Sequence, residues 1–451
     1  MTNEPSELER RQERRNERVS VTPSDTPEFA MRTHGERDRD RILYSSALRR
    51  LAGVTQVVKA GEADVYHNRL THTLEVAQIG RRMAQYLQRY MLAKPDLAAL
   101  QAMCDPDVVE AACLAHDLGH PPFGHVAEEE LDKLAIEFGN DDGFEGNAQS
   151  FRIVTRLSKY SDGNTYGLNL SRATLNAVLK YPWLRDVAER NTKKYRKYGA
   201  YREDEEAFVF AREGYEQDIK SLEAQVMDHA DAIAYAVHDL SDFYKSGILN
   251  FYNLINDKEF FDRHFQRNKP NFLIGQYAGK EDEARRYLLE SVVAFLPGKV
   301  YDFGEEAEVA QTTNDSVMIA SLINRSLDIK KEGGMLIQVI DDEVILTINF
   351  LKSIIWEYVI KRPQLATQQQ GQIKIIRRLF KFYYHALESR EYRMLPSQYL
   401  DDIESGRLRS LDGSNRVRLA VDLVARLSEN QAQTMYNRIS GFNGGSLLEY
   451  I

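Results

Sequence analysis

The sequence predicts a mainly helical protein, because apolar residues recur at helical spacing along most of the chain. The clearest runs are 108–116 and 222–233, and similar runs continue to the last quarter of the chain. One stretch has strand character. In 334–346, β-branched residues around Asp341 and Asp342 favour a short hairpin. We therefore expect helices throughout, with one small β element.

Length and composition are those of a globular protein. The 451 residues suffice for a large core or for two or three packed lobes, and 43% of them are apolar and 28% charged. No run approaches the roughly 20 apolar residues of a membrane span. The N-terminus also lacks the apolar region of a secretory signal. We expect a cytoplasmic protein without a membrane partner.

Net charge and cysteine content exclude further classes of protein. A net charge of −9 argues against a protein that mainly coats nucleic acid, so an anionic ligand needs a local basic patch. Cys104 and Cys113 match neither a disulfide framework nor a zinc-ligand spacing. Both are expected to be small core side chains.

The N-terminal part divides in two. Residues 1–30 mix arginine and glutamate with little apolar material, which predicts a mobile arm or a solvated helix. Segment 31–56 has a charged start followed by an apolar pattern, which is typical of an amphipathic helix. Most of its arginines are expected in solvent, but Arg49 and Arg50 flank the apolar face and could project into a pocket.

Three histidines and an aspartate cluster in the segment CLAHDLGHPPFGH, which spans 113–125. His116 and Asp117 end the helical run that Asp105 and Pro106 begin, because the glycine and the two prolines that follow cannot continue a helix. Adjacent helical residues point about 100° apart. His116 and Asp117 can therefore meet on one small object between them, and a metal ion fits that requirement.

Other candidates lie on either side of this segment. His72 falls on the buried face of a helix that begins near Arg69, and alone it fits a hydrogen-bonded core histidine. Arg69, one turn earlier, could clamp a phosphate. His125 and Glu128 share a helix face at i and i+3 and could act as a general acid with its tuning carboxylate, or as a surface ion pair.

Asp231 completes the candidate metal site. It stands in a stripe with Tyr235, Asp239 and Asp242, and this acidic row is bordered by apolar residues. We expect the row to face a pocket. The mixed nitrogen and oxygen donors of the expected ligand set suit Mg²⁺, Mn²⁺ or Fe²⁺, with Zn²⁺, Co²⁺ or Ni²⁺ allowed by affinity; this set is His72, His116, Asp117 and Asp231.

Segment 180–210 is aromatic and basic, then acidic. Its tyrosines and lysines could stack on and neutralise a nucleotide or a single strand. The alternative is a helix followed by a solvated surface loop, and we favour this alternative.

The order of these residues resembles the HD phosphohydrolase superfamily. The words RDRDRILYSSALRRL, HNRLTHTLEVA, HDLGHPPFGH, FEGNAQSFR and HADAIAYAVHDL resemble the deoxynucleoside triphosphate triphosphohydrolases of the dGTPase type, in their bacterial branch. The resemblance covers about 31–245. It implies an all-α fold, an HD-domain helical core with an additional C-terminal helical region, and hydrolysis of a dNTP to the deoxynucleoside and triphosphate.

The same resemblance assigns roles to single residues. His125 is implied as the general acid on the leaving 5′ oxygen, with Glu128 as its supporting carboxylate. Arg69 and His120 are implied as contacts of the triphosphate. Gln56, Tyr235 and Asp239 are implied around the sugar, where they would exclude ribonucleotides. This sequence has Glu145 and Gly146 where some members carry a further histidine.

The expected organisation is an arm at 1–30, a metal-dependent core at 31–245 and a C-terminal helical region at 246–451 that serves packing and oligomerisation. The family implies homo-oligomers, often tetramers or hexamers, with regulatory dNTP sites between subunits; single-stranded DNA is a further candidate partner. Two alternatives stay open. The chain could be another HD phosphohydrolase, such as a nucleoside 5′-monophosphatase or a phosphodiesterase, or a nucleotide-sensing or strand-binding protein with little turnover.

Overall fold

The structure analysed is a computed structural model of the 451-residue chain. The residues that it describes are 7–20, 31–56, 68–160, 166–245, 247–250, 315–332, 335–397, 399 and 413–442, with isolated positions between 254 and 283. Two stretches lie outside these residues, 57–67 and most of 251–314. The sequence predicts a small hairpin or loop in the first stretch and two helical runs in the second.

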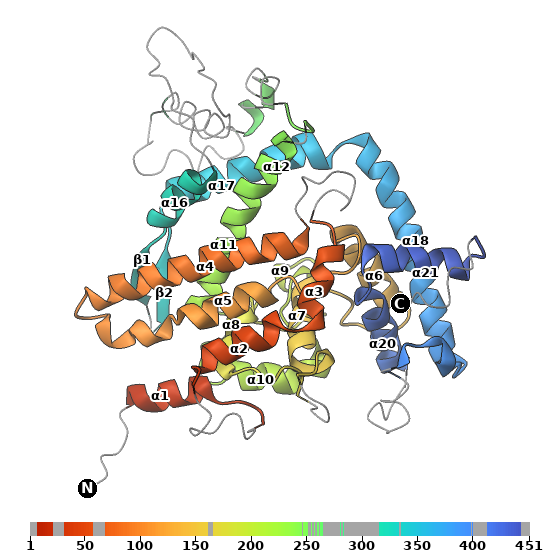
Figure 1. Ribbon diagram of the computed structural model, residues 1–451, viewed down its shortest axis with the longest axis horizontal. Coiled ribbons are helices and arrows are strands. Elements are labelled where there is room, and N and C mark those ends of the chain that lie inside the picture. The colour runs from red at the N-terminus through yellow and green to blue at the C-terminus, as the bar shows by residue number, and fades with distance from the viewer. Residues whose placement is uncertain are drawn as a thin grey trace.

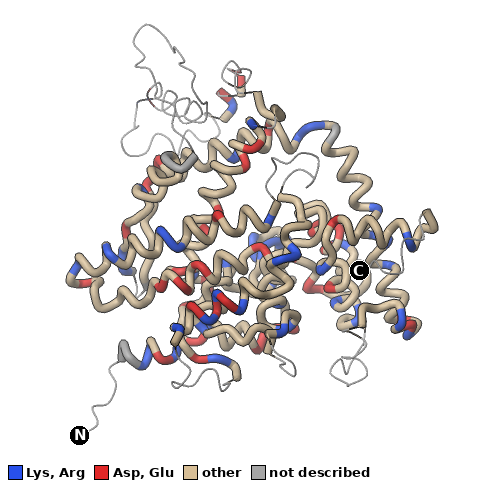
Figure 2. The backbone as a smooth tube through the Cα atoms, viewed as in Figure 1, with Lys and Arg blue, Asp and Glu red and all other residues tan. Residues whose placement is uncertain are grey.

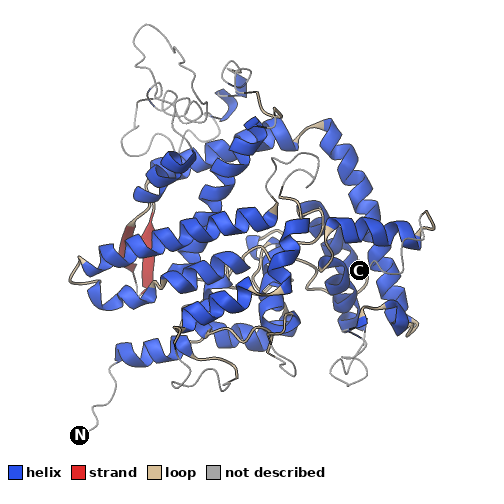
Figure 3. Ribbon diagram, in the orientation of Figure 1, coloured by secondary structure: helices blue, strands red, loops and turns tan. Residues whose placement is uncertain are grey.

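The described residues are mostly helical, which confirms the predicted fold class (Figures 1 and 3). The helices of the N-terminal half are α1 (Glu7–Asn16), α2 (His34–Leu43), α3 (Ser46–Arg50), α4 (Arg69–Leu92), α5 (Pro106–Ala115), α6 (His125–Glu137), α7 (Gly146–Arg152), α8 (Arg172–Val178), α9 (Lys193–Arg196), α10 (Glu205–Arg212), α11 (Leu222–Ala234) and α12 (Leu240–Lys245). Those of the C-terminal half are α16 (Asp315–Asn324), α17 (Asp342–Ile355), α18 (Pro363–Glu388), α20 (Gly413–Ala425) and α21 (Glu429–Ile439).

Helices α4, α5 and α11 form the centre of the larger hydrophobic core, with α2 and α8 against α5. Their starts follow from local chemistry, because the side chains of Asn68, Asp105 and Ser221 each accept a hydrogen bond from a backbone N–H of the first turn. The predicted start of α5 at Asp105 and Pro106 is thereby confirmed. Cys104 and Cys113 are buried in this core, as expected.

A second core joins α6 to the C-terminal helices α18, α20 and α21. Helix α18 carries the chain from the end of α17 across to this side of the molecule (Figure 1). Basic and acidic residues are interspersed along the chain in both parts (Figure 2). None of the helices in the described residues combines the length and apolar character needed to cross a membrane.

The predicted hairpin exists, but it is displaced toward the N-terminus. Strands β1 (Asp328–Glu332) and β2 (Met335–Val339) pair in antiparallel register, with Asp328 opposite Val339. The prediction of a turn at Asp341 and Asp342 is wrong. The side chain of Asp341 instead accepts a hydrogen bond from the backbone N–H of Glu343 and caps α17, so the β-branched residues that follow lie in a helix with one buried face.

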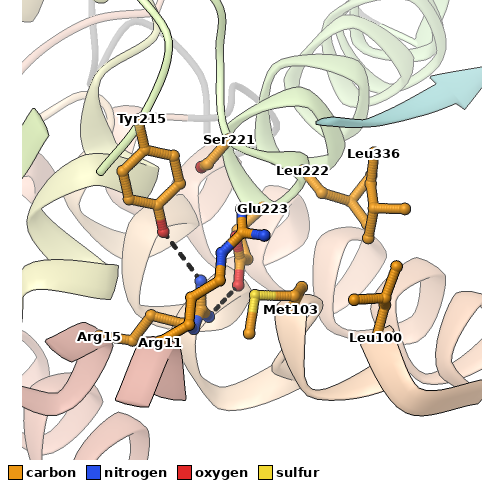
Figure 4. A pocket seen from close by; sticks show the side chains of 9 residues that line it. All are labelled: Arg11, Arg15, Leu100, Met103, Tyr215, Ser221, Leu222, Glu223 and Leu336. Carbon is orange, nitrogen blue, oxygen red and sulfur yellow. Dashed lines mark hydrogen bonds and ion pairs between the residues drawn. The ribbon is translucent and has the colours of Figure 1, made fainter. Parts of the chain in front are cut away.

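The described part of the N-terminal arm, residues 7–20, packs against the helical body. Arg15 donates to the hydroxyl of Tyr215 and pairs with Glu223 in the first turn of α11 (Figure 4). Arg18 donates to Asp38, with 2.6 Å between Nη1 and Oδ1. The arginine-rich composition suggested solvation, but these guanidinium groups are buried because carboxylates from distant segments neutralise them. A small pocket beside α1 is lined by Arg11, Arg15, Leu100, Met103, Tyr215, Ser221, Leu222, Glu223 and Leu336 (Figure 4).

Segment 180–210 differs from the favoured expectation of a solvated loop. Tyr198 and Tyr201 are buried and in edge-to-face contact, so neither is free to stack on a nucleic-acid base. The guanidinium of Arg418, from α20, lies 3.6 Å from the ring centre of Tyr201. The segment is therefore part of the packing between the two halves of the chain.

A buried ionic network ties α20 to α7. Arg152 donates to Asp422 at 3.0 Å and to Asp204 at 3.0 Å, and Gln149 donates to Asp422 at 2.8 Å. Asp422 and Asp204 are almost fully buried. The C-terminal half thus fixes the helix that packs beneath the histidine-rich loop.

We expect Asp422→Ala to destabilise the protein by about 3–5 kcal/mol, because it removes one of the three carboxylates, those of Asp204, Asp422 and Glu203, that neutralise the buried guanidinium of Arg152. Glu129→Ala serves as the control, since Glu129 forms only an exposed pair with Lys133, and it should change stability by less than about 0.5 kcal/mol. Urea denaturation of both variants measures the difference. A loss below about 1 kcal/mol for Asp422→Ala would show that the network does not stabilise the fold.

Candidate active site

Three helices of the larger core bring the expected metal ligands together. His72 lies in the first turns of α4, His116 and Asp117 directly follow α5, and Asp231 lies in the last turn of α11. The Nε2 atoms of His72 and His116 lie 3.2 and 3.6 Å from Oδ1 of Asp231. The structure therefore brings these side chains close together, as the sequence predicts.

Three of these side chains, those of His72, His116 and Asp117, can each offer one ligand atom to a common ion, and the carboxylate of Asp231 lies beside both imidazoles. Nε2 of His116 is 3.4 Å from Oδ1 of Asp117, and ligand atoms of an octahedral ion with bonds of about 2.1 Å stand about 3 Å apart. Nδ1 of His116 donates to the carbonyl of Cys113 at 2.6 Å, which directs the lone pair of Nε2 toward the carboxylates. In the described residues that buried Nε2 has no hydrogen-bond partner. An ion at this point would satisfy it.

Positive groups keep the two carboxylates ionised. Burial opposes ionisation of Asp117, but His116, His120 and Arg69 hold its pKa well below the usual range. Burial also opposes ionisation of Asp231, and there Lys180 at 2.7 Å is the main group that lowers the pKa. Both carboxylates are therefore available as ligands at neutral pH.

His125 and Glu128 form the expected pair at the start of α6. Nδ1 of His125 lies 2.7 Å from Oε2 of Glu128. The imidazole is 70% exposed, whereas the carboxylate is buried. Only one partner lies at the surface, so the pair is not the surface ion pair that was the alternative. Burial opposes ionisation of Glu128, but His120, His125 and Lys197 lower its pKa strongly. An ionised carboxylate behind an exposed imidazole is the arrangement of an oriented proton donor.

The loop that carries these histidines is held from several sides. Arg50 donates to the carbonyls of Leu118 and His120 at 2.6 and 2.8 Å. This arginine, which the sequence places beside an apolar face, thus binds the backbone of the loop. Burial, together with Arg69 and Arg426, lowers the pKa of Arg50 to about 10. From α21, Glu429 accepts from the backbone N–H groups of Thr55 and Phe123. The C-terminal half therefore helps to shape the site.

Gly119 allows the closest approach in this loop. A Cβ there would lie 2.1 Å from the carbonyl oxygen of Gly146 and 2.3 Å from the backbone nitrogen of Ser150, so only glycine fits. Ser150 in turn accepts from the backbone N–H of Gly119 and donates to the carbonyl of His116, both at 2.8 Å. The helix start predicted in FEGNAQSFR, with inward polar groups, thus supports the His-Asp turn directly.

Among the residues expected around a substrate, Arg69 and His120 lie beside the candidate metal ligands. Arg69 is buried and donates to Oδ2 of Asp117 at 2.7 Å, so its guanidinium already orients a candidate metal ligand. His120 lies 3.0 Å from Asp117 and 3.4 Å from Glu128, between the two halves of the site. Both therefore lie at the centre of the site.

The three residues expected at a sugar lie on two elements. Tyr235 and Asp239 begin and end a single π-helical turn, Tyr235–Asp239, that follows α11, and such turns frequently occur at functional sites. Gln56 follows the bridge between Thr55 and Asn68, which places it beside the start of α4. Its buried Oε1 has no hydrogen-bond partner in the described part of the chain.

Sequence reasoning missed several basic residues of the site. Lys180 pairs with Asp231 and Asp228, and Lys197 pairs with Glu145 at 2.8 Å close to Glu128. Lys352, from α17, is electrostatically coupled to Asp231 and Asp239 and lies 5.6 Å from the ring centre of Tyr235. Their segment 180–197 was recognised as basic, but nothing in the pattern of α17 singled out Lys352.

Comparison with known proteins gives concordant results. A family model described as "HD domain" matches residues 69–236, and one described as "Phosphohydrolase-associated domain" matches 339–438. The chain is 35% identical to a deoxyguanosinetriphosphate triphosphohydrolase-like protein of Bifidobacterium longum over 91% of its own length and 84% of that protein. Proteins with the same name from Streptomyces coelicolor and Shewanella baltica are 35% and 29% identical and are covered to 93% each.

Proposed function

Because this chain belongs to the family of deoxyguanosinetriphosphate triphosphohydrolase-like proteins, with an HD domain, we propose that it hydrolyses dGTP or another dNTP to the deoxynucleoside and inorganic triphosphate. The single observation that best supports this function is the meeting of His72, His116, Asp117 and Asp231 beside the His125–Glu128 pair. That arrangement would place a metal site and a proton donor side by side.

HD domains bind divalent metal ions, and the donor set here suits Mg²⁺ or Mn²⁺, with Fe²⁺, Co²⁺, Ni²⁺ and Zn²⁺ as further candidates. The proposed ligands are His72, His116, Asp117 and Asp231. A bound ion would supply positive charge to a phosphoryl oxygen and orient the attacking water. Arg69 and Lys180 hold the second oxygen atoms of Asp117 and Asp231, and so keep these carboxylates in place.

In the proposed reaction, water attacks the α-phosphorus and the bond between that phosphorus and the 5′ oxygen breaks. The water oxygen stays on the triphosphate, and its surplus proton goes to solvent. His125 gives a proton to the departing 5′ oxygen, and Glu128 orients the ring through its contact with Nδ1. Because the imidazole is exposed and its partner is buried, the ring can face a substrate while its other nitrogen stays anchored.

The charges around the site favour a triphosphate over a neutral ligand. A dNTP brings about four negative charges to a protein whose net charge is −9, so local cations are required. Arg69, Lys180 and Lys197 surround the proposed ligands and the proton donor, and His120, whose pKa is lowered by burial and by Arg69, adds a neutral imidazole. Gln56, Tyr235 and Asp239 are proposed for the sugar, where an unpartnered buried amide oxygen and a buried carboxylate suit its 3′-hydroxyl group.

We further propose that residues 31–245 form the catalytic core and that 246–451 stabilise it. The ties from Asp422 and Glu429 to that core support this division. An oligomer with regulatory dNTP sites, and binding of single-stranded DNA, are proposals that rest on family resemblance alone.

The test is a matrix of metals and nucleotides with identification of products. Purified protein is incubated with Mg²⁺ or Mn²⁺ and the four dNTPs, singly and in pairs, in ¹⁸O-labelled water. We expect equal amounts of deoxynucleoside and triphosphate, with the label in the triphosphate. Orthophosphate or pyrophosphate as the product would instead identify another HD phosphohydrolase. No nucleoside from any mixture, with dNTP binding retained, would favour a nucleotide-sensing protein.

A further inference from the structure

A second cluster of metal-ligating side chains lies beside the proposed catalytic ion. His120, His125 and Glu128 each offer one ligand atom, and these atoms all lie within 4.8 Å of one another. Among the described residues the other such group is the one with His72, His116 and Asp117. Proton donation by His125 needs Glu128 alone, so it does not explain why a second imidazole converges on the same carboxylate.

The distances suit a tetrahedral ion. Ligand atoms with bonds of about 2.0–2.1 Å to such an ion stand about 3.3 Å apart. Nε2 of His120 lies 3.4 Å from Oε1 of Glu128, which is already that spacing. Nδ1 of His125 lies 2.7 Å from Oε2 of Glu128, and this ring is 70% exposed, so it has room to move outward by the small distance required.

The surroundings also favour an ion. Nδ1 of His120 lies 3.0 Å from Oδ1 of Asp117, so a carboxylate stands on the far side of the ring from Glu128. Oε1 of Glu128 is buried without a hydrogen-bond partner in the described residues. A Cβ at Gly146 would lie 2.2 Å from this oxygen, so the glycine leaves the space beside it open.

We propose that His120, His125 and Glu128 form a second metal site that takes a borderline transition ion such as Zn²⁺. Two histidines and a glutamate with one open position are a ligand set that this ion uses in proteins. Binding of the ion to Nδ1 of His125 releases the proton of that nitrogen to solvent and leaves a neutral ring. A neutral imidazole is a far weaker acid than an imidazolium, so the second ion inhibits the hydrolysis proposed above, and this inhibitory effect rests on that proposed function.

The chain contains a matched control for the site. On α18, His385 and Glu388 form the same i, i+3 pair, with Nδ1 and Oε2 3.3 Å apart, but they belong to no ligand group among the described residues. A histidine next to a glutamate is therefore present in both places, and only the pair on α6 has a second imidazole.

The experiment measures bound zinc directly. Full-length wild type, His125→Ala, Glu128→Gln and His385→Ala are dialysed against buffered Zn²⁺, and the retained metal is counted by mass spectrometry. We expect His125→Ala and Glu128→Gln to retain one ion fewer per chain than wild type, and His385→Ala to retain as many. Since His125 is exposed, its replacement should leave the helical circular dichroism unchanged.

Equal zinc content in wild type and His125→Ala would overturn the proposal, as would an equal loss in His385→Ala, which would indicate adventitious binding to any such pair. In wild type assayed with Mg²⁺ or Mn²⁺, added Zn²⁺ should suppress turnover at the concentrations that fill the second site. The zinc count does not depend on turnover, so the site remains testable even if the proposed hydrolysis is not observed.

Discussion

Asp231→Asn is expected to lower turnover by about 10³-fold or more, because a metal ion supplies several kcal/mol of transition-state stabilisation and each 1.36 kcal/mol corresponds to a factor of ten. Oδ1 of Asp231 is the atom that both imidazoles approach, at 3.2 and 3.6 Å. An amide is neutral and a weaker ligand, and the substitution keeps the shape of the side chain. Folding should therefore be largely preserved while metal affinity falls.

Asp228→Asn is the matched control. Asp228 lies one turn earlier on α11 and also pairs with Lys180, at 3.0 Å against 2.7 Å for Asp231. It forms ion pairs with Lys180 and Lys220, whereas Asp231 also approaches the imidazoles of His72 and His116. We expect Asp228→Asn to retain activity within about tenfold of wild type. Steady-state assays and metal analysis of both variants decide between the two acids, and similar losses in both would contradict the assignment of Asp231 as a ligand.

The sequence predicted the ligand set because its signals are local. Asp105 and Pro106 mark the start of α5, and the glycine and prolines after Asp117 mark its end. The apolar stripe around His72 and the bordered acidic row at Asp231 put these two side chains on inward helix faces. Spacing within one helix cannot show that distant helices come together. The prediction that four particular candidates share one ion therefore rested on the stripe pattern together with the family resemblance.

The misplaced features depend on partners far away in the sequence. Arg15 is buried because Tyr215 and Glu223 lie opposite it, about 200 residues later. Tyr201 is buried against Arg418 for the same reason. The hairpin was misplaced by local ambiguity instead: short apolar, β-branched runs fit a strand and a helix equally well, and the cap at Asp341 decided in favour of α17.

The C-terminal half was expected to serve packing, and its detailed role could not be read from composition. Glu429 accepts hydrogen bonds from Thr55 and Phe123, and so holds the segments next to Gln56 and His125. Its neighbours in sequence give no sign of this, because the two N–H groups that it binds lie more than 300 residues earlier. Glu429 therefore acts on the site through backbone contacts, whereas Asp422 acts through the side chains of Gln149 and Arg152.

His125→Ala is expected to lower the turnover rate by about 10²–10⁴-fold, the usual contribution of a positioned general acid. Its imidazole is exposed, so little stability should be lost, and the ligand set around His116 is left intact. The loss should appear in kcat rather than in KM, because the proton is needed only as the 5′ oxygen departs. His385→Ala, which removes a histidine from the equivalent exposed pair, should behave as wild type.

Glu128→Gln separates proton donation from mere packing at this position. The amide keeps the shape of the side chain but carries no charge opposite the imidazole, so kcat should fall while KM stays nearly unchanged. A substrate with a leaving group that needs no proton, such as a 4-nitrophenyl triphosphate, should restore most of the rate in both variants. If His125→Ala remained equally slow with that substrate, the imidazole would act in binding or in shaping the loop, and the proton would have to come from elsewhere.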